Sequence, residues 1–220
     1  MKFSMHITIF ILIKCALVLF SVSCTKAPEI ETIRLYARAS QAYSAGRFSE
    51  TAEILHKEKK FHPALVLRAK AEYFSGNLEN AEKTCRLALK KRPSSFEAKL
   101  FLSRILREKD DLSGAVKLTE SLLADNPQDI RTLRLAAEFA FEAGKLDEAA
   151  ALLDRAAEFS AESAMVLLDR ARLRWVSGMG NETAMLAALE DLSRARAMLP
   201  WDTPLLRAIL NLENTIKEVM

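Results

Sequence analysis

Glycine and proline are scarce in this chain, with six residues of each among 220. Long irregular loops are therefore not expected, because these two residues dominate turns and loops. Alternating runs of Val, Ile and Thr, which are typical of β-strands, are absent after residue 23. The abundant residues are Ala, Leu, Glu, Lys and Arg, which are good helix formers. The composition favours an all-α fold.

Cysteine is also rare. Of the three cysteines, Cys15 and Cys24 lie in the N-terminal segment and only Cys85 lies in the body, so no intramolecular disulfide can form there. The formal net charge is +3, and the N-terminal segment carries Lys2 and Lys14 but no acid, which leaves the body nearly neutral. This balance argues against a general nucleic-acid-binding protein.

The N-terminal segment differs from the rest of the chain. A basic start at Lys2 precedes an apolar run from Ile7 to Val22, which Lys14 interrupts. The run is shorter than the ~20 residues that a membrane-spanning helix usually needs. Small residues follow it, as in a secretory signal. We expect a signal peptide over residues 1–23, and an uncleaved membrane anchor is the alternative interpretation.

The stretch FSVSCTK resembles the lipobox of bacterial lipoproteins, with small Ser23 before Cys24, although Ser21 stands where that motif usually has Leu. The resemblance implies that Cys24 is lipidated and begins a short tether over residues 24–31. Two or three acyl chains would hold the protein on a bilayer. Thr25, in place of Asp, implies the outer membrane and a periplasm-facing protein. Alternatively, Cys24 is a bystander near an ordinary cleavage site.

Three stretches of the body repeat one pattern. Gly76, Asp110 and Gly144 are 34 residues apart, and Pro93 and Pro127 keep the same spacing. A helical pattern of about 12 residues precedes each of these anchors and another follows it. A left-handed glycine can end the first helix, and a proline stops the second. Each unit is therefore predicted to be a helical hairpin.

Small or apolar residues recur at fixed distances from the anchors, where two helix backbones must cross closely. They lie seven residues before, five after and twelve after: Ala69, Ser103, Ala137 and Ala171; Ala81, Ala115 and Ala149; Ala88, Leu122 and Ala156. This pattern resembles the tetratricopeptide repeat (TPR), although the usual Trp and Tyr are missing from most units. The resemblance implies an all-α, right-handed superhelical solenoid of antiparallel helix pairs.

About five TPR-like repeats are expected over residues 32–202. The first is anchored on Gly46, and its second helix is expected to be about one turn short. The fifth is anchored on Gly178 and is followed by a five-residue insertion, MGNET. Residues 203–220 are predicted to form a C-terminal capping helix, because a solenoid needs its last exposed face covered.

Patterns that would indicate catalysis or metal binding are not found. His56 and His62, the histidines of the body, are six residues apart and would face different sides of a helix. No zinc spacing or phosphate loop appears, and the acidic turn KDDLSG lacks the ligand ladder of a calcium loop. Cys85 falls at a core position and is expected to be an inert buried thiol. We expect a protein that is not an enzyme and needs no cofactor or metal.

The first helices of successive TPR units line a concave groove. On this chain the groove positions combine cationic and aromatic side chains: Tyr43, Lys70, Tyr73, Arg104, Arg107, Arg131, Arg134, Phe141, Arg172 and Trp175. Arginine forms forked hydrogen bonds with carboxylates, and aromatic rings supply rigid contact area. The groove is therefore predicted to bind an acidic or C-terminal segment of a partner protein. Alternatively, these are ordinary solvated helix residues.

The expected function is that of a membrane-anchored scaffold within a cell-envelope assembly or secretion machine. The alternatives are an accessory or regulatory subunit of a cell-wall enzyme and an uncleaved, signal-anchored TPR protein. The sequence leaves the oligomeric state open.

Overall fold

The computed structural model describes residues 28–159, 163–199 and 203–220, so the predicted signal peptide and Cys24 lie outside the described residues. The described part of the chain is all-helical, which confirms the predicted fold class. Its helices are α2 (Ile30–Ser44), α3 (Phe48–Ile54), α4 (His62–Phe74), α5 (Leu78–Lys91), α6 (Phe96–Glu108), α7 (Leu112–Asp125), α8 (Ile130–Glu142), α9 (Leu146–Phe159), α10 (Ala164–Ser177), α11 (Glu182–Ala197) and α12 (Pro204–Val219).

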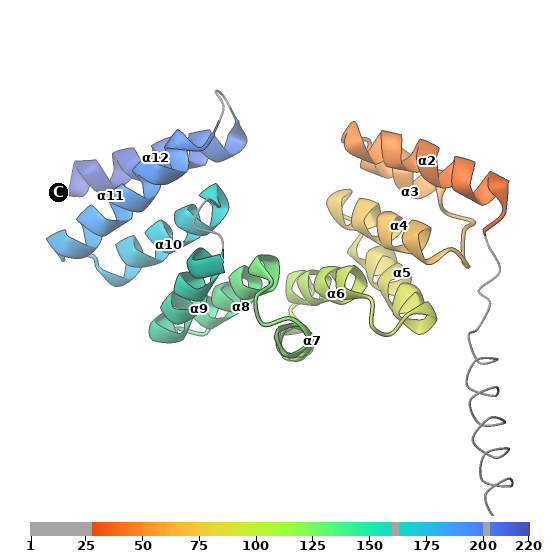
Figure 1. Ribbon diagram of the computed structural model, residues 1–220, viewed down its shortest axis with the longest axis horizontal. Helices are drawn as coiled ribbons and strands as arrows, with labels where there is room; N and C mark the ends of the chain where they lie inside the picture. Colours follow the sequence, from red (N-terminus) through yellow and green to blue (C-terminus); the bar gives the residue numbers. More distant parts are fainter. Residues whose placement is uncertain (1–27, 160–162, 200–202) are drawn as a thin grey trace, which may run out of the picture.

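Consecutive helices form antiparallel pairs, and the pairs stack into an arc (Figure 1). The first helices of the pairs, α4, α6, α8 and α10, lie on the inner side of the arc, and their partners α5, α7, α9 and α11 lie on the outer side. The arc opens between α2 and α12. This arrangement is the superhelical solenoid of helix pairs that the repeat pattern predicts.

The small residues predicted at the helix crossings are buried. Ala81, Ala115 and Ala149 on the outer helices are at most 1% exposed, and Ser103 on α6 is fully buried. The Ser103 hydroxyl donates a hydrogen bond of 2.9 Å to the carbonyl oxygen of Ala115. Short side chains let the two backbones of a pair approach closely, and this contact satisfies the one polar group among them.

The turn inside each pair needs a residue with left-handed backbone conformation. Gly144 has a φ of 74°, and Asp110, predicted to replace glycine in the third repeat, has a φ of 63°. Aspartate tolerates this conformation better than most residues. The next residue, Asp111, caps α7, because its carboxylate accepts a hydrogen bond of 2.9 Å from the Gly114 amide.

The first repeat is shorter than the sequence indicated. Its second helix, α3, has seven residues, whereas α5 and α7 each have fourteen, so it lacks two turns rather than one. The position twelve residues after Gly46 holds Glu58, where later repeats have Ala or Leu. The Glu58 carboxylate accepts hydrogen bonds from the Lys60 and Phe61 amides instead of packing, and this turn ends the pair.

The fifth repeat also departs from the expected register. Gly178 has a φ of −110°, and the left-handed residue is Gly180, with a φ of 83°. Gly178 is needed for space, because a Cβ placed there would lie 2.3 Å from the Ala184 Cβ and 2.7 Å from the Arg174 carbonyl oxygen. The MGNET insertion is therefore spread over the turn and the start of α11, which has sixteen residues.

Both ends of the solenoid are helical. The first described helix, α2, begins at Ile30, inside the tether predicted for residues 24–31. Glu31 in its first turn interacts favourably with the positive end of the helix dipole. The predicted capping helix is present: the Thr203 hydroxyl accepts a hydrogen bond of 3.0 Å from the Leu206 amide. Ile209 is fully buried on the face that contacts α10 and α11. None of the helices described here has the length and hydropathy of a transmembrane span.

Candidate partner-binding groove

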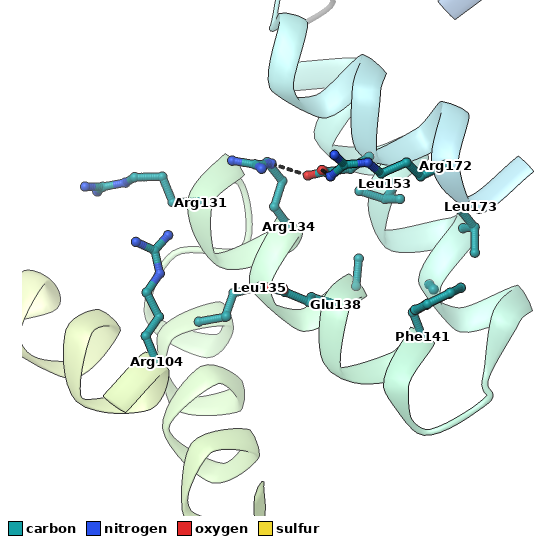
Figure 2. Close-up of a pocket in the computed structure, with 12 residues that line it drawn as sticks. Arg104, Arg131, Arg134, Leu135, Glu138, Phe141, Leu153, Arg172 and Leu173 are labelled. Atoms are coloured by element: carbon teal, nitrogen blue, oxygen red, sulfur yellow. Dashed lines mark hydrogen bonds and ion pairs between the residues drawn. The ribbon is translucent and has the colours of Figure 1, made fainter. Parts of the chain in front are cut away.

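The predicted groove residues all lie on the inner helices α2, α4, α6, α8 and α10. Five of them line one cavity of about 330 Å³ between α6, α8, α9 and α10: Arg104, Arg131, Arg134, Phe141 and Arg172. In Figure 2, Arg104 of α6 and Arg131 and Arg134 of α8 lie on one side of the view, and Phe141 and Leu173 lie on the other. The cavity thus has a cationic end and an apolar end.

Two arginines of the cavity, one on α8 and one on α10, are paired with the same acid of α10. The Arg134 Nε lies 2.6 Å from the Asp169 carboxylate, an ion pair between α8 and α10 that is drawn in Figure 2. Arg172 lies 3.9 Å from the other oxygen of the same carboxylate. Half of the Arg172 side chain remains exposed, so its guanidinium retains room for another acceptor.

Arg107 on α6 also forms ion pairs with acids of the neighbouring repeat. Its guanidinium lies 2.6 Å from the Glu138 carboxylate and 3.7 Å from that of Glu142, both on α8. Burial lowers the pKa of Arg107, but the hydrogen bond to Glu138 and the charges of Glu138, Glu142 and Glu108 together hold the pKa above the usual value. Arg107 is therefore already engaged by the chain itself.

Glu97 connects three inner helices. This residue on α6 forms ion pairs with Lys70 on α4 and Arg131 on α8. Burial raises the pKa of Glu97, but the hydrogen bonds from Lys70 and Arg131 outweigh it and hold the pKa below its ordinary 4.5. The Arg131 guanidinium also lies 4.8 Å from the centre of the Phe96 ring. These contacts fix two of the predicted groove cations in place.

Arg104 differs from the other cations of the groove. It has no carboxylate partner among the described residues, and its guanidinium lies 5.4 Å from the centre of the Phe101 ring. Burial, together with the Arg134 and Arg131 cations, lowers the pKa of Arg104 below its usual value. A partly buried arginine beside other cations is a ready position for an anionic group from another molecule.

The remaining predicted residues lie elsewhere. Tyr43 and Tyr73 lie in the first repeats, outside the cavity. Lys70 lines a second cavity of about 420 Å³ with His62, whose pKa is lowered by burial and by Arg92. Trp175 packs against the C-terminal hydrophobic cluster of α10, α11 and α12. The structure therefore divides the predicted set into a central cationic group and two peripheral ones.

Sequence reasoning missed two acids of the inner helices and the apolar wall of the cavity. Asp169 and Glu97 were not predicted, although a signal exists: Arg134 and Asp169 are 35 residues apart, and Glu97 and Arg131 are 34 apart. Opposite charges separated by about one repeat fall on adjacent inner helices. The apolar wall consists of Leu135, Leu153 and Leu173 with Ala137 and Ala149. The described residues contain no cluster of potential ligands for a metal ion.

Comparisons with known proteins agree with this architecture. Residues 73–138 and 106–173 match the tetratricopeptide repeat family. No curated protein matches the chain. Among solved structures, a thermophilic TPR protein from Thermus thermophilus is 18% identical, with a TM-score of 0.69 over 81% of this chain and 97% of that one. MamA from Desulfovibrio magneticus is 17% identical, with a TM-score of 0.66 over 79% and 100%.

A third solved structure is YrrB, described as a TPR protein with an unusual peptide-binding site. It is 15% identical, with a TM-score of 0.56 over 82% of this chain and 90% of that one. The family match covers residues 73–173, and the solved structures show that the described helices have the fold of a TPR solenoid.

Proposed function

We propose that this protein is a scaffold whose concave groove binds an acidic segment of a partner protein. The observation that carries the proposal is Arg104, a partly buried cation with no carboxylate partner among the described residues. The cavity around it has four arginines and two carboxylates, so its lining is cationic. A carboxylate that enters this cavity replaces water around Arg104 and forms a charge-assisted hydrogen bond.

The neighbouring ion pairs define how the partner is held. Arg107, Arg131 and Arg134 are turned toward acids of the chain, which keeps their guanidinium groups ordered on the rim. Ordered side chains reduce the entropy lost on binding. The apolar wall near Phe141, which is 40% exposed, offers contact area for the side chains that flank the acid.

The groove is tested with a fluorescein-labelled peptide of six glutamates and the matching peptide of six glutamines. We expect the glutamate peptide to bind the wild type, and Arg104→Gln to weaken it about tenfold or more, as the loss of one charged hydrogen bond predicts. The matched control is Arg86→Gln, because Arg86 is an exposed arginine of α5, on the outer side of the arc. Equal binding of the two peptides would contradict the proposal.

The membrane tether is a separate part of the proposal and rests on the sequence. The FSVSCTK segment supports lipidation of Cys24, and Thr25 supports the periplasm-facing side of an outer membrane. On this basis the scaffold works within a cell-envelope assembly or secretion machine. The test is metabolic labelling with an alkyne fatty acid, in the wild type and in Cys24→Ala. Fatty-acid label that persists in Cys24→Ala would exclude lipidation at Cys24. The lipoprotein assignment would also be excluded if the variant were cleaved normally and stayed in the membrane fraction.

The partner is identified by crosslinking in the native membrane. A photoreactive residue in place of Phe141 samples the groove, and one in place of Phe159 samples an exposed phenyl site at the end of outer helix α9. We expect a distinct crosslinked protein from the Phe141 site that is absent from the Phe159 site. The same products from both sites would contradict groove binding.

A further inference from the structure

Five aromatic side chains of the first three repeats form one continuous row. The Tyr43 and Phe48 rings are 5.3 Å apart, Phe48 and Phe74 are stacked at 5.1 Å, and Phe74 and Phe101 are 6.0 Å apart. Tyr73 contacts both Phe74 and Phe101. We call these five residues the aromatic track. It runs along the ends of α2 and α4, past the start of α3, to α6.

The track leads directly to the cationic end of the cavity. Phe101 is 6% exposed and forms the floor, and the Arg104 guanidinium lies 5.4 Å from its ring centre. Lys70 Nζ lies 4.9 Å from the same centre. Phe74, at the middle of the track, is 46% exposed. Tyr43, Phe48 and Tyr73 are half-buried, so the track presents ring edges around the exposed face of Phe74. Apolar surface rimmed by polar groups is typical of interaction sites.

The two tyrosines add hydrogen-bond donors to this surface. Neither the Tyr43 nor the Tyr73 hydroxyl is hydrogen-bonded to any residue that the structure describes. Burial raises the pKa of both phenols, helped by the nearby carboxylates of Glu97 and Glu108 respectively, so both remain protonated. Each hydroxyl is therefore available to donate to a carbonyl oxygen of a bound segment.

We propose that the aromatic track binds an extended, proline-containing segment whose acidic residue is held by Arg104. The inference rests on the proposed function, because it extends the same groove toward the N-terminal repeats. A polyproline II segment makes no internal hydrogen bonds and rises ~3.1 Å per residue, so each step of 5–6 Å along the rings spans about two residues. Its carbonyl oxygens accept from tyrosine hydroxyls, and its rings pack on aromatic faces.

Charge and shape select this partner over others. Arg104 lies beside Phe101 at one end of the track and has no carboxylate partner among the described residues, so the segment carries acid rather than base near that end. A single row of rings contacts one narrow edge of a ligand, which suits an extended chain better than the wide apolar face of an amphipathic helix. An extended proline-rich segment also loses little entropy on binding, because it is already ordered.

The test uses full-length protein in detergent and three labelled peptides of equal length. The first has two glutamates flanked on each side by three prolines. The second replaces the prolines with alternating Gly and Ser, and the third replaces the glutamates with glutamines. We expect the first peptide to bind about tenfold more tightly than either of the others. Phe74→Ala should reduce its affinity to that of the Gly/Ser peptide, while Arg104→Gln should weaken both glutamate peptides.

The matched control is Phe159→Ala, because Phe159 is 44% exposed on α9 and lies away from the track. If the wild type binds the proline and Gly/Ser peptides with equal affinity and Phe74→Ala has no effect, the proposed role of the aromatic track would be overturned. The proposed acidic-segment site at Arg104 would not be affected. If the third peptide, which has no glutamate, binds as tightly as the first and its binding still requires Phe74, the proposed function and the role of Arg104 would be overturned.

A second copy of this chain is the other candidate to occupy the aromatic track, and it has to be excluded. Sedimentation of wild type and Phe74→Ala over a concentration series separates the two cases. We expect the same oligomeric state for both proteins. Self-association that Phe74→Ala abolishes would make the track an interface between copies and would overturn the proline-segment proposal.

Discussion

Arg170 donates two hydrogen bonds, of 2.8 and 2.7 Å, to the Asp191 carboxylate and so joins α10 to α11. Asp191 is 1% exposed, and Arg174 donates a third hydrogen bond of 2.8 Å to the same carboxylate. The pKa of Arg170 is raised chiefly by the hydrogen bonds that it donates to Asp191. This buried carboxylate is the polar centre of the fifth repeat.

Removing the Asp191 carboxylate should destabilise the protein strongly. Asp191→Ala leaves two arginines without their shared acceptor, and breaking a buried ion pair in this way costs about 3 kcal/mol. Asp154→Ala is the matched control, because Asp154 contacts the same Arg170 at 3.1 Å from an exposed position and should cost less than about 1 kcal/mol. Urea denaturation followed by circular dichroism measures both. Similar midpoints for the two variants would contradict this account.

Gly178→Ala should destabilise the fifth repeat by overpacking. The new Cβ would lie 2.3 Å from the Ala184 Cβ, and such crowding typically costs about 1–3 kcal/mol. The second substitution Ala184→Gly should restore part of the loss, since it removes the nearest clashing atom. A thermal denaturation series of the single and double variants measures the coupling. Purely additive effects would show that the contact with Ala184 is not the cause of the loss.

Cys85 should be unreactive in the folded protein. The side chain is 1% exposed, and burial, with Glu72 nearby, raises the pKa of the thiol to about 12. The thiolate fraction at pH 8 is then on the order of 10⁻⁴. In a protein with Cys15 and Cys24 replaced by Ser, Ellman's reagent should label Cys85 slowly without denaturant and rapidly in urea. Rapid labelling of the native protein would contradict the repeat register.

The Glu97 ion pairs should make stability depend on pH below about 4.5. Because the pKa of Glu97 is lower in the folded state, its contribution is present above 4.5 and is lost as the pH falls through the folded value. Glu97→Gln should lower the urea midpoint at pH 7, and the difference from wild type should shrink at pH 3. A difference of equal size at both pH values would show that the charge of Glu97 contributes nothing.

The fold could be predicted to the level of individual core positions. The 34-residue spacing was enough to place Ala81 and Ala115 at buried crossings and Asp110 in a left-handed turn. This works because a repeat applies one packing rule several times, so each unit supports the assignment of the others. At Glu58 the unit departs from that rule, and the predicted length of the second helix was wrong. At Gly178 the helix ends as predicted, but the left-handed residue is Gly180.

The candidate groove could be predicted only in part. Spacing alone places Arg104 and Arg134 on inner helices, but it does not show which cations the chain neutralises. That depends on the rotation of one helix against the next, which brings Asp169 to Arg134 and brings no acid to Arg104. Helix rotation is set by many small packing contacts, and no short sequence pattern records it.

The shortness of α3 gives the two ends of this molecule different mechanical properties. In a solenoid each pair is held by its immediate neighbours, so resistance to unfolding is local. At the N-terminal end, the second helix of the first pair has seven residues, whereas the helix at the C-terminal end has sixteen. Under tension the arc will therefore unwind from its first pair inward, and the last pairs will keep their shape longest.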